Sequence, residues 1–322
     1  MSFTEHKSLR DAYGATLAEL GALYPDIVAL DADLSGSTRT SKFAAKFPKR
    51  FFNMGVAEAD MMSTAAGFAA AGKIPFASTF AVFASGRAWD QVRQSVCLSR
   101  LNVKIVASHG GISVGEDGPT HQALEDIALM RALPFMNVVV PCDAHETAAV
   151  IRAAAEHIGP MYVRTAREKF PVVLPPETKF TLGKGTLLRQ GADVAVIACG
   201  YMVSQALLAA EKLAGEGIEA SVVNMSTIKP LDEDMVTQMA TTCGAIVTAE
   251  EHSITGGLGA AVAEVVCETE PVPVIRMGMK SPVGQSGKPE ELLDFYGMNP
   301  AGVAEAVYKA IALKRRMAGG TR

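Results

Sequence analysis

Short apolar runs alternate with helix-like segments along almost the whole chain. In the first half, the runs at 26–30, 74–78 and 103–107 each lead to residues with a helical period, and a polar turn follows the first and the last of them. Apolar runs of about four to eight residues bounded by such turns are typical of buried strands. Strands that alternate with helices form mainly parallel sheets with helices on both faces. The pattern therefore predicts an α/β fold built from doubly wound sheets.

The alternation is interrupted between residues 167 and 185, where prolines cluster. Proline can neither donate to a strand ladder nor continue a helix. We therefore predict a linker at 171–186, between a first domain at 1–170 and a second α/β domain at 187–322. The length of 322 residues is sufficient for two domains that each have a core.

Composition argues against several classes of protein. Hydrophobic residues make up 49% of the chain and charged residues 20%, as in a globular protein and unlike a disordered one. The formal net charge of −4 gives no field that would attract nucleic acid or an anionic membrane, so neither partner is predicted. We expect no membrane span and no signal peptide, because no apolar run is suitable for either. The dispersed cysteines predict reduced thiols, a cytoplasmic location and no zinc site.

A glycine-rich loop at 108–122 combines several groups that can take part in chemistry. It contains His109, Asp117 and His121, and it follows the predicted strand at 103–107. Open α/β sheets bind ligands at the carboxyl ends of their strands, and glycine lets the backbone approach a ligand closely. The loop is therefore a candidate substrate site. A turn-rich surface loop with solvated histidines is the alternative interpretation.

Other candidate residues follow neighbouring strands of the first predicted sheet. If these strands adjoin, one cleft receives the residues after their carboxyl ends, which are Asp31, Asp33, Glu58, Phe80, Phe83 and His109. Glu58 begins an apolar helix, where a buried charge needs a partner, although a helix-start glutamate favoured by the helix dipole is the alternative. Phe80 and Phe83 lie one helical turn apart and suit either a cofactor wall or the core. Arg164 and Arg167 are either surface guanidiniums or anion clamps.

Together these motifs resemble the transketolase family. The residues that carry the resemblance are GVAE at 55–58, STF at 78–80, GEDGPTHQ at 115–122, PCD at 141–143, EEH at 250–252 and GGLG at 256–259. In order and spacing they match the pyrimidine-binding and C-terminal domains of that family over nearly the whole chain. The resemblance implies thiamine diphosphate as cofactor and transfer of a two-carbon ketol unit from a ketose phosphate to an aldose.

On the cofactor side, the resemblance implies roles for four residues. Glu58 would hydrogen-bond the aminopyrimidine ring of thiamine diphosphate, which makes it a catalytic residue. Phe80 and Phe83 would form an aromatic wall beside that ring, and Asp33 would be a carboxylate on the same side. The family often has a third aromatic residue one helical turn later, where this sequence has Gly86.

On the substrate side, the resemblance implies contacts with a sugar phosphate. His109 would face the phosphate, and His121 would lie near the reacting hydroxyls. Asp117 would accept from a sugar hydroxyl and so select stereochemistry. The phosphate itself would be bound by Arg10, Ser37 and Arg167.

One departure from the family pattern bears on the assembly. Complete transketolases begin with a diphosphate-binding domain whose Gly-Asp-Gly motif helps to hold Mg²⁺ and the diphosphate, and no Gly-Asp-Gly occurs in this sequence. Carboxylate and backbone oxygens suit Mg²⁺, and the diphosphate needs a cation. The resemblance therefore implies that a separate diphosphate-binding subunit holds Mg²⁺ and shares the cofactor, as in an α2β2 hetero-oligomer.

Three other functions compete with this interpretation. A β subunit of a 2-oxoacid dehydrogenase would lack the two-histidine pattern of the loop at 108–122. A catalytically silent regulatory subunit would not need to keep Glu58, His109 and His121 together. A nucleotide-cofactor oxidoreductase would use the glycines at 256–260, but this run does not follow directly from a predicted strand.

Overall fold

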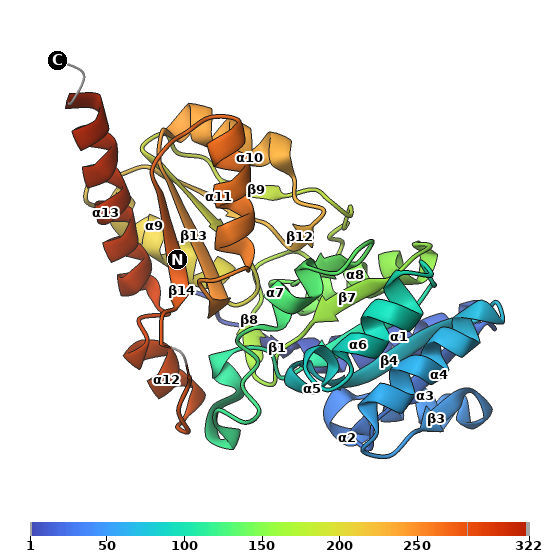
Figure 1. Cartoon of the computed structure of the whole chain (residues 1–322). Helices are drawn as coiled ribbons and strands as arrows, with labels where there is room; N and C mark the ends of the chain where they lie inside the picture. Colours follow the sequence, from blue (N-terminus) through green and yellow to red (C-terminus); the bar gives the residue numbers. More distant parts are fainter. Residues whose placement is uncertain (1, 282, 320–322) are drawn as a thin grey trace.

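The computed structural model describes residues 2–281 and 283–319, and its strands and helices alternate as predicted (Figure 1). The largest sheet contains β2 (Ile27–Asp31), β3 (Phe51–Asn53), β4 (Ile74–Phe80), β5 (Lys104–Ser108), β6 (Asn137–Val139), β7 (Met161–Arg164) and β12 (Thr227–Lys229). Their order is β12-β6-β7-β5-β4-β2-β3. Every neighbouring pair is parallel except β12 with β6.

Helices cover both faces of this sheet (Figure 1). On one face, α1 (Leu9–Leu23) and α8 (Ala144–Glu156) bury Leu17 and Ile151 against Phe76 and Val106 of the strands. On the other face lie α4 (Glu58–Ala70), the π-helix η2 (Val92–Cys97) and α7 (Asp126–Arg131). The shorter helices of this half are α2 (Ser35–Thr38), α3 (Ser41–Lys46), η1 (Pro48–Arg50), α5 (Ala81–Ser85), α6 (Trp89–Gln91) and η3 (Ile112–Asp117).

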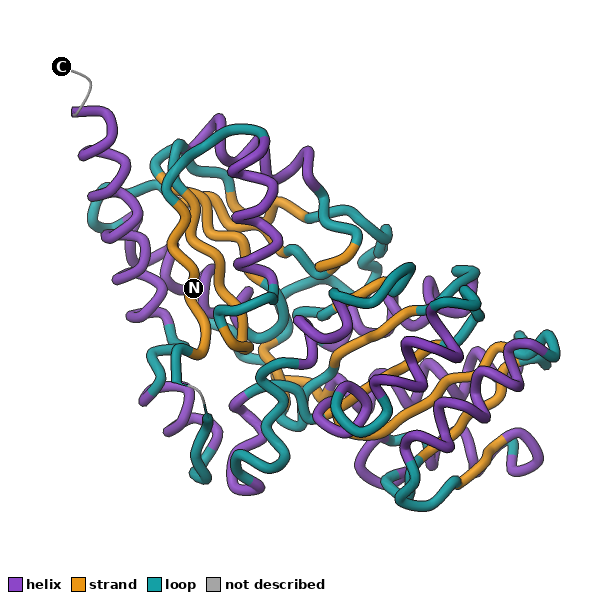
Figure 2. Tube along the Cα trace, viewed as in Figure 1, coloured by secondary structure: helices purple, strands orange, loops and turns teal. Residues whose placement is uncertain are grey.

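A second sheet follows with the same design. It contains β9 (Thr186–Arg189), β10 (Val194–Ala198), β11 (Ala220–Asn224), β13 (Ile246–Ser253) and β14 (Val274–Met279), in the order β14-β13-β10-β11-β9. Only β9 runs antiparallel to its neighbour. The helices around it are α9 (Met202–Ala214), α10 (Glu233–Cys243), α11 (Leu258–Glu268), α12 (Pro289–Phe295) and α13 (Pro300–Gly319). Two mainly parallel sheets with helices on both faces confirm the predicted fold class (Figure 2).

The two sheets are joined more closely than the sequence predicts. The short strand β12 lies beyond the predicted linker in the sequence but pairs with β6 of the first sheet. One continuous core includes Met61 under the first sheet and Val262 under the second. Strand β12 is only three residues long and shows no periodic pattern in the sequence. Its pairing with β6 is a tertiary contact, so the sequence alone does not predict it. Residues 172–185, all described by the structure, contain no helix or strand.

The start of the first helix differs from its predicted position. A helical period from residue 6 predicts a helix over 6–23, but α1 begins at Leu9. The preceding residues form β1 (His6–Ser8), which pairs antiparallel with β8 (Lys169–Pro171). Ser8 then caps α1, because its side chain accepts from the amide of Asp11. This strand pair brings Arg10 and Arg167 close together.

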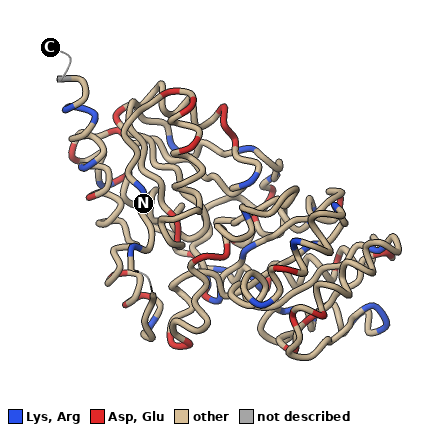
Figure 3. Tube along the Cα trace, in the orientation of Figure 1, with Lys and Arg blue, Asp and Glu red and all other residues tan. Residues whose placement is uncertain are grey.

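Charged residues are distributed along the whole trace (Figure 3). Lys and Arg, and also Asp and Glu, occur in both halves of the molecule. Among the described residues, no helix is long and apolar enough to cross a membrane. All five cysteines are free; four are buried and Cys267 is exposed.

Candidate active site

The carboxyl ends of three adjacent strands form the floor of the candidate site. Asp31 of β2 is in register with Ser78 of β4, and Phe80 of β4 is in register with Ser108 of β5. Because these strands adjoin, the residues that follow them meet at one edge of the sheet. The predicted convergence of candidate residues is therefore present in the fold.

Glu58 is the first residue of α4, and its side chain is only 4% exposed. A guanidinium nitrogen of Arg87 donates to Glu58 Oε1 at 3.0 Å. The guanidinium carbon of Arg87 also lies 4.0 Å from the ring centroid of Phe83. The buried carboxylate thus has the partner that its burial requires. Sequence reasoning missed Arg87, because its position after Gly86 in an irregular turn gives no sign that it faces Glu58.

Phe80 and Phe83 form an aromatic wall beside Glu58. Their rings are stacked, with centroids 5.7 Å apart. The ring of His121 meets both rings edge-on, at centroid distances of 6.2 Å from Phe80 and 5.4 Å from Phe83. Phe80 is buried, whereas Phe83 is half-buried and has the guanidinium of Arg87 over its ring. The two phenylalanines therefore pack against both an imidazole and a guanidinium.

His109 is held in an unusual backbone conformation directly after β5. Its φ is 61°, a value that is uncommon for residues other than glycine and that is found more often at functional sites. The imidazole is 3% exposed, and its Nδ1 shares a hydrogen bond of 2.9 Å with the hydroxyl of Ser108. Burial lowers the pKa of His109 to about 3, with further lowering from Arg10, Arg167 and His121. The ring is therefore neutral at ordinary pH.

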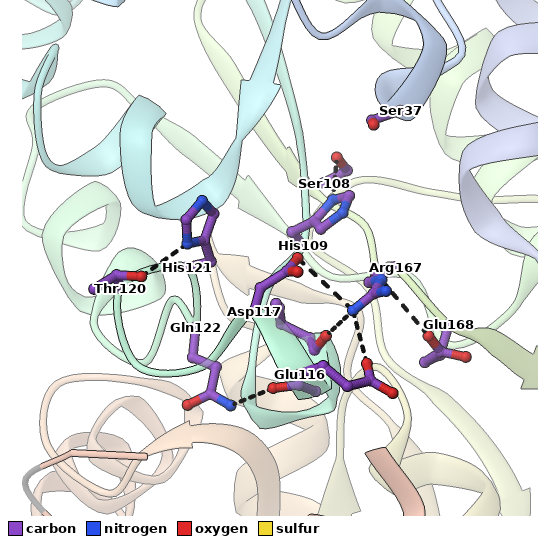
Figure 4. Close-up of polar contacts among 12 residues, drawn as sticks. Ser37, Ser108, His109, Glu116, Asp117, Thr120, His121, Gln122, Arg167 and Glu168 are labelled. Carbon is purple, nitrogen blue, oxygen red and sulfur yellow. Dashed lines mark hydrogen bonds and ion pairs between the residues drawn. The ribbon is translucent and has the colours of Figure 1, made fainter. Parts of the chain in front are cut away.

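The loop that carries the histidines is partly packed. Ile112, Ser113 and Val114 within it are buried. The hydroxyl of Thr120 shares a hydrogen bond of 2.9 Å with Nδ1 of His121. Figure 4 shows how the labelled residues of the loop lie. His109 is buried, in contrast to the solvated histidine of the alternative interpretation, whereas Glu116, Asp117 and Thr120 are exposed and His121 is half-buried.

The C-terminal half of the chain holds this loop from the other side. Glu251 at the end of β13 accepts from the amide of Ser113 at 2.6 Å. The side chain of Gln122 donates to the carbonyl of Gln285 at 2.8 Å. A Cβ at Gly111 would lie 2.2 Å from Glu251 Oε1, so only glycine leaves room for this contact. Sequence analysis did not assign Glu251 or Gln285 to the site, because both contacts join residues that are far apart in the chain.

Arg10 brings together the three predicted phosphate-binding positions. Its guanidinium donates to the carbonyls of Ser37 and Arg167, both at 2.8 Å. Burial lowers the pKa of Arg10, and the neighbouring charges of Arg39 and Arg167 lower it further. A cavity of about 400 Å³ is lined by Arg10, Arg39, Arg167 and Lys169. The cavity also has carboxylates on its wall, and these are Asp11, Glu168 and Glu290.

Arg167 links this cationic cavity to the histidine loop (Figure 4). Its Nη1 donates to the carbonyl of Val114 and to Glu116 Oε2 at 3.1 Å, and it lies 3.7 Å from Asp117 Oδ2. Asp117 and Arg167, both predicted to bind substrate, are therefore neighbours. Arg164, in contrast, is not an anion clamp, because it is 5% exposed and its Nε lies 2.9 Å from the buried Asp126.

Asp33 lies at the margin of this group. It is exposed, and its Oδ1 accepts from the side chain of Asn53 at 3.0 Å, while its amide donates to Asn53 Oδ1. Asn53 Oδ1 also accepts from the amide of Gly55. Asp33 therefore fixes the turn that precedes Glu58. The neighbouring Asp31 is buried and accepts hydrogen bonds from the hydroxyls of Thr38 and Thr40. Its carboxylate therefore holds the start of the next segment in place.

The glycine motif at 256–260 does not form a nucleotide-binding turn. The carboxylate of Glu250 accepts from the amides of Leu258 and Gly259 at the start of α11, each at 2.8 Å. A Cβ at Gly257 would lie 2.1 Å from that carboxylate. The amides that would bind a phosphate already have an acidic partner within the chain. The oxidoreductase alternative is therefore not supported.

The residues near Glu58 can be compared with what the predicted cofactor, thiamine diphosphate, would require. The carboxylate of Glu58 and the ring of Phe83 share one planar neighbour, the guanidinium of Arg87, so the two side chains are spaced to contact a planar nitrogen group together. Among the described residues, no group of three or more His, Cys, Asp or Glu side chains is arranged to hold a metal ion. The described residues near Glu58 include the hydrogen-bond acceptor and the aromatic ring that the pyrimidine end of that cofactor would need.

Comparison with known proteins places these features in a family context. The family model "Transketolase, pyrimidine binding domain" matches residues 5–172, and "Transketolase, C-terminal domain" matches residues 183–303. A protein of Methanocaldococcus jannaschii named as a transketolase C-terminal section is 49% identical over 94% of this chain and 96% of its own length. The 6-deoxy-6-sulfo-D-fructose transketolase subunit of Clostridium sp. is 43% identical over 96% of both chains.

Solved structures agree with these matches. A split-gene transketolase, described as an inactive β4 tetramer, is 50% identical with a TM-score of 0.89, and the match covers 96% of this chain and 100% of that one. A transketolase of Pichia stipitis in complex with sedoheptulose 7-phosphate is 28% identical with a TM-score of 0.81. That match covers 97% of this chain but 47% of the other, so this chain spans about half the length of the Pichia protein.

Proposed function

The chain belongs to the transketolase family, and we propose that it is the subunit of a split transketolase that carries the pyrimidine-binding and sugar-binding half of the active site. The observation that carries this proposal is the buried Glu58 beside the stacked Phe80 and Phe83, with His109 and His121 on the same wall. The predicted division into domains at 1–170 and 187–322 is part of the proposal. The cytoplasmic location remains a prediction.

The proposed reaction moves a two-carbon ketol unit from a ketose phosphate to an aldose. Thiamine diphosphate, when bound, would supply the chemistry that breaks and forms the carbon–carbon bond. Glu58 would hydrogen-bond a ring nitrogen of the cofactor, and its carboxyl oxygen would accept or donate the proton of that bond. Phe80 and Phe83 would hold the ring plane and exclude water from it. The burial of Glu58 supports this role, because water cannot compete for its oxygens.

The two histidines would act on the sugar. His109 is neutral at ordinary pH because burial lowers its pKa to about 3, so its ring offers one donor and one acceptor. Thr120 engages Nδ1 of His121, which leaves Nε2 as the nitrogen that would face a substrate hydroxyl. Asp117 beside Arg167 would accept from a further hydroxyl. These positions would select the stereochemistry of the sugar.

A phosphate on the substrate would bind in the cationic cavity. Arg10 and Arg167 line this cavity, and Arg10 donates to the carbonyl of Ser37. Guanidinium groups suit phosphate because their planar fork can donate to two oxygens at once. The predicted phosphate-binding set of Arg10, Ser37 and Arg167 is retained in this proposal. Asp33, predicted as a carboxylate that binds the cofactor, stays part of the proposal, and its bond to Asn53 would place it beside the turn before Glu58.

The other half of the site would come from a second subunit. We propose that a diphosphate-binding subunit holds Mg²⁺ and the diphosphate, and that two copies of each chain form an α2β2 hetero-oligomer. The solved relative that is 50% identical is described as an inactive β4 tetramer, which supports the need for a different partner. The described residues contain no carboxylate cluster suited to Mg²⁺.

Purification of the tagged chain from its native cell tests this proposal. We expect a second subunit with a Gly-Asp-Gly motif to purify with it, and the complex to transfer a ketol unit in the presence of Mg²⁺ and thiamine diphosphate. The chain alone should have no activity and should bind the cofactor weakly. Micromolar or tighter Mg²⁺-dependent binding by the chain alone would contradict the proposed division of the site.

A further inference from the structure

Arg87 makes two contacts that coincide with the proposed pyrimidine subsite. Its guanidinium donates to Glu58 Oε1 at 3.0 Å. The same group lies over the ring of Phe83, with its carbon 4.0 Å from the ring centroid. A planar nitrogen cation therefore bonds the carboxylate and covers the aromatic ring at the same time.

These are the two contacts that the proposed function gives to the aminopyrimidine ring. That ring is also planar, and it would need a hydrogen bond to Glu58 and an aromatic neighbour. A ring that made both contacts would occupy the space of the guanidinium, so it could enter only after Arg87 leaves. Arg87 contacts both partners, Glu58 and Phe83, with one guanidinium.

The position of Arg87 allows such a departure. Its side chain is 53% exposed, whereas that of Glu58 is 4% exposed. Arg87 follows α5 in an irregular turn, and the preceding Gly86 has no side chain that would confine it. An exposed guanidinium can move into water at little cost, while the carboxylate of Glu58 is fixed in place by α4.

Resting on the proposed function, we propose that Arg87 is a positioning residue that occupies the pyrimidine subsite and is displaced when thiamine diphosphate binds. Before assembly it neutralises the buried Glu58 and covers Phe83. The cofactor must compete with it, so Arg87 weakens cofactor binding while it stabilises the subunit without cofactor. Arg87 thus keeps Glu58 paired and Phe83 covered until the partner subunit and the cofactor bind.

The first test is calorimetric titration of the purified hetero-oligomer with Mg²⁺ and thiamine diphosphate. We expect Arg87→Met to bind the cofactor about 3- to 30-fold more tightly than wild type, because the ion pair of Arg87 with Glu58 and its cation–π contact with Phe83 no longer compete. Arg100→Met is the matched control, since Arg100 also lies over a phenylalanine, Phe135, at 3.9 Å. The control should bind as wild type does. Unchanged or weaker binding by Arg87→Met would overturn the inference and leave the proposed function intact.

The second test uses this chain alone and needs no cofactor. Thermal unfolding is measured for wild type, Arg87→Met, Glu58→Gln and the double variant. We expect Arg87→Met to lower Tm, because it leaves a buried carboxylate without its partner. The loss should largely disappear in the Glu58→Gln background, whereas additive effects would overturn the inference. Failure of the wild-type complex to bind thiamine diphosphate at all would overturn both this inference and the proposed function.

Discussion

The imidazole of His109 lies flat against the ring of Phe80, with centroids 3.6 Å apart and planes inclined by 21°. This contact joins the predicted sugar side of the site to its predicted cofactor side. Because Phe80 ends β4 and His109 follows β5, the register of two parallel strands fixes the pair. The stacking also removes the imidazole from water. This burial should make the stability of the chain depend on pH.

Stability should depend on pH through His109. Its pKa is lowered to about 3 in the folded chain, whereas an unfolded histidine titrates near 6.5. Between these values the unfolded state binds more protons, so stability rises with pH from about 3 to 6.5 and is lost as pH falls. The contribution is at most about 1.4 kcal/mol per pH unit.

Urea unfolding of wild type and His109→Asn between pH 4 and 7 measures this effect. Asparagine is chosen because it tolerates the positive φ of 61° at this position better than most residues. We expect a steeper dependence of unfolding free energy on pH for wild type than for the variant. Parallel curves would show that His109 titrates normally in the folded protein.

Replacement of Glu58 should abolish catalysis in the assembled enzyme. Glu58→Gln keeps the shape of the side chain but removes its ability to exchange a proton, so kcat should fall by about 100- to 10,000-fold. Asp60→Asn is the matched control, because Asp60 is an exposed carboxylate in the same first turn of α4. Steady-state kinetics of both complexes provides the measurement. Near-wild-type turnover of Glu58→Gln would remove Glu58 from the mechanism.

Much of this site follows from local sequence signals. Apolar runs locate the strands, and parallel strands place Glu58, Phe80 and His109 at one edge of the sheet. The sequence does not predict Arg87, because its role depends on how an irregular turn folds back over α4. It also does not predict β12, whose pairing with β6 depends on the relative positions of the two halves. Local periodicity predicts elements, but contacts between distant segments require the folded chain.

Removal of Arg10 should weaken binding of phosphorylated sugars more than that of unphosphorylated ones. Charge-assisted hydrogen bonds contribute about 1.5–3 kcal/mol, so Arg10→Met should raise KM for a ketose phosphate by about 10- to 150-fold. Arg10 also bonds the carbonyls of Ser37 and Arg167, and its loss loosens that wall of the cavity. Arg152→Met is the control, since Arg152 forms an exposed ion pair with Glu19. Equal increases in KM for phosphorylated and unphosphorylated ketoses would contradict a phosphate site here.

Glu251 connects the C-terminal half of the chain to the loop that carries the histidines. It is 3% exposed, accepts from the amide of Ser113, and lies near the buried guanidinium of Arg164. Burial raises the pKa of Glu251, and the charge of Arg164 opposes that rise. The carboxylate therefore ties the histidine loop to β13 through an ion network inside the protein.

Glu251→Ala should destabilise the chain by about 3–5 kcal/mol, because it leaves Arg164 with less compensating charge and the amide of Ser113 without its acceptor. Glu264→Ala is the matched control, since Glu264 pairs with Arg131 across the same two halves but is 61% exposed. The Glu264→Ala substitution should lower the free energy of unfolding by only about 0–1 kcal/mol. Urea unfolding compares the two variants, and equal losses would refute a special role for Glu251.

Kinetics of the assembled Glu251→Gln variant separates positioning from simple stability. Glutamine keeps an oxygen that can accept from Ser113, so the variant should fold, but without the charge that faces Arg164 the loop is held less firmly. We expect KM for the sugar to rise while the affinity for thiamine diphosphate stays unchanged, because Glu58 and Phe83 lie on other elements. A parallel loss of cofactor affinity would mean that Glu251 supports the whole fold and not the substrate loop in particular.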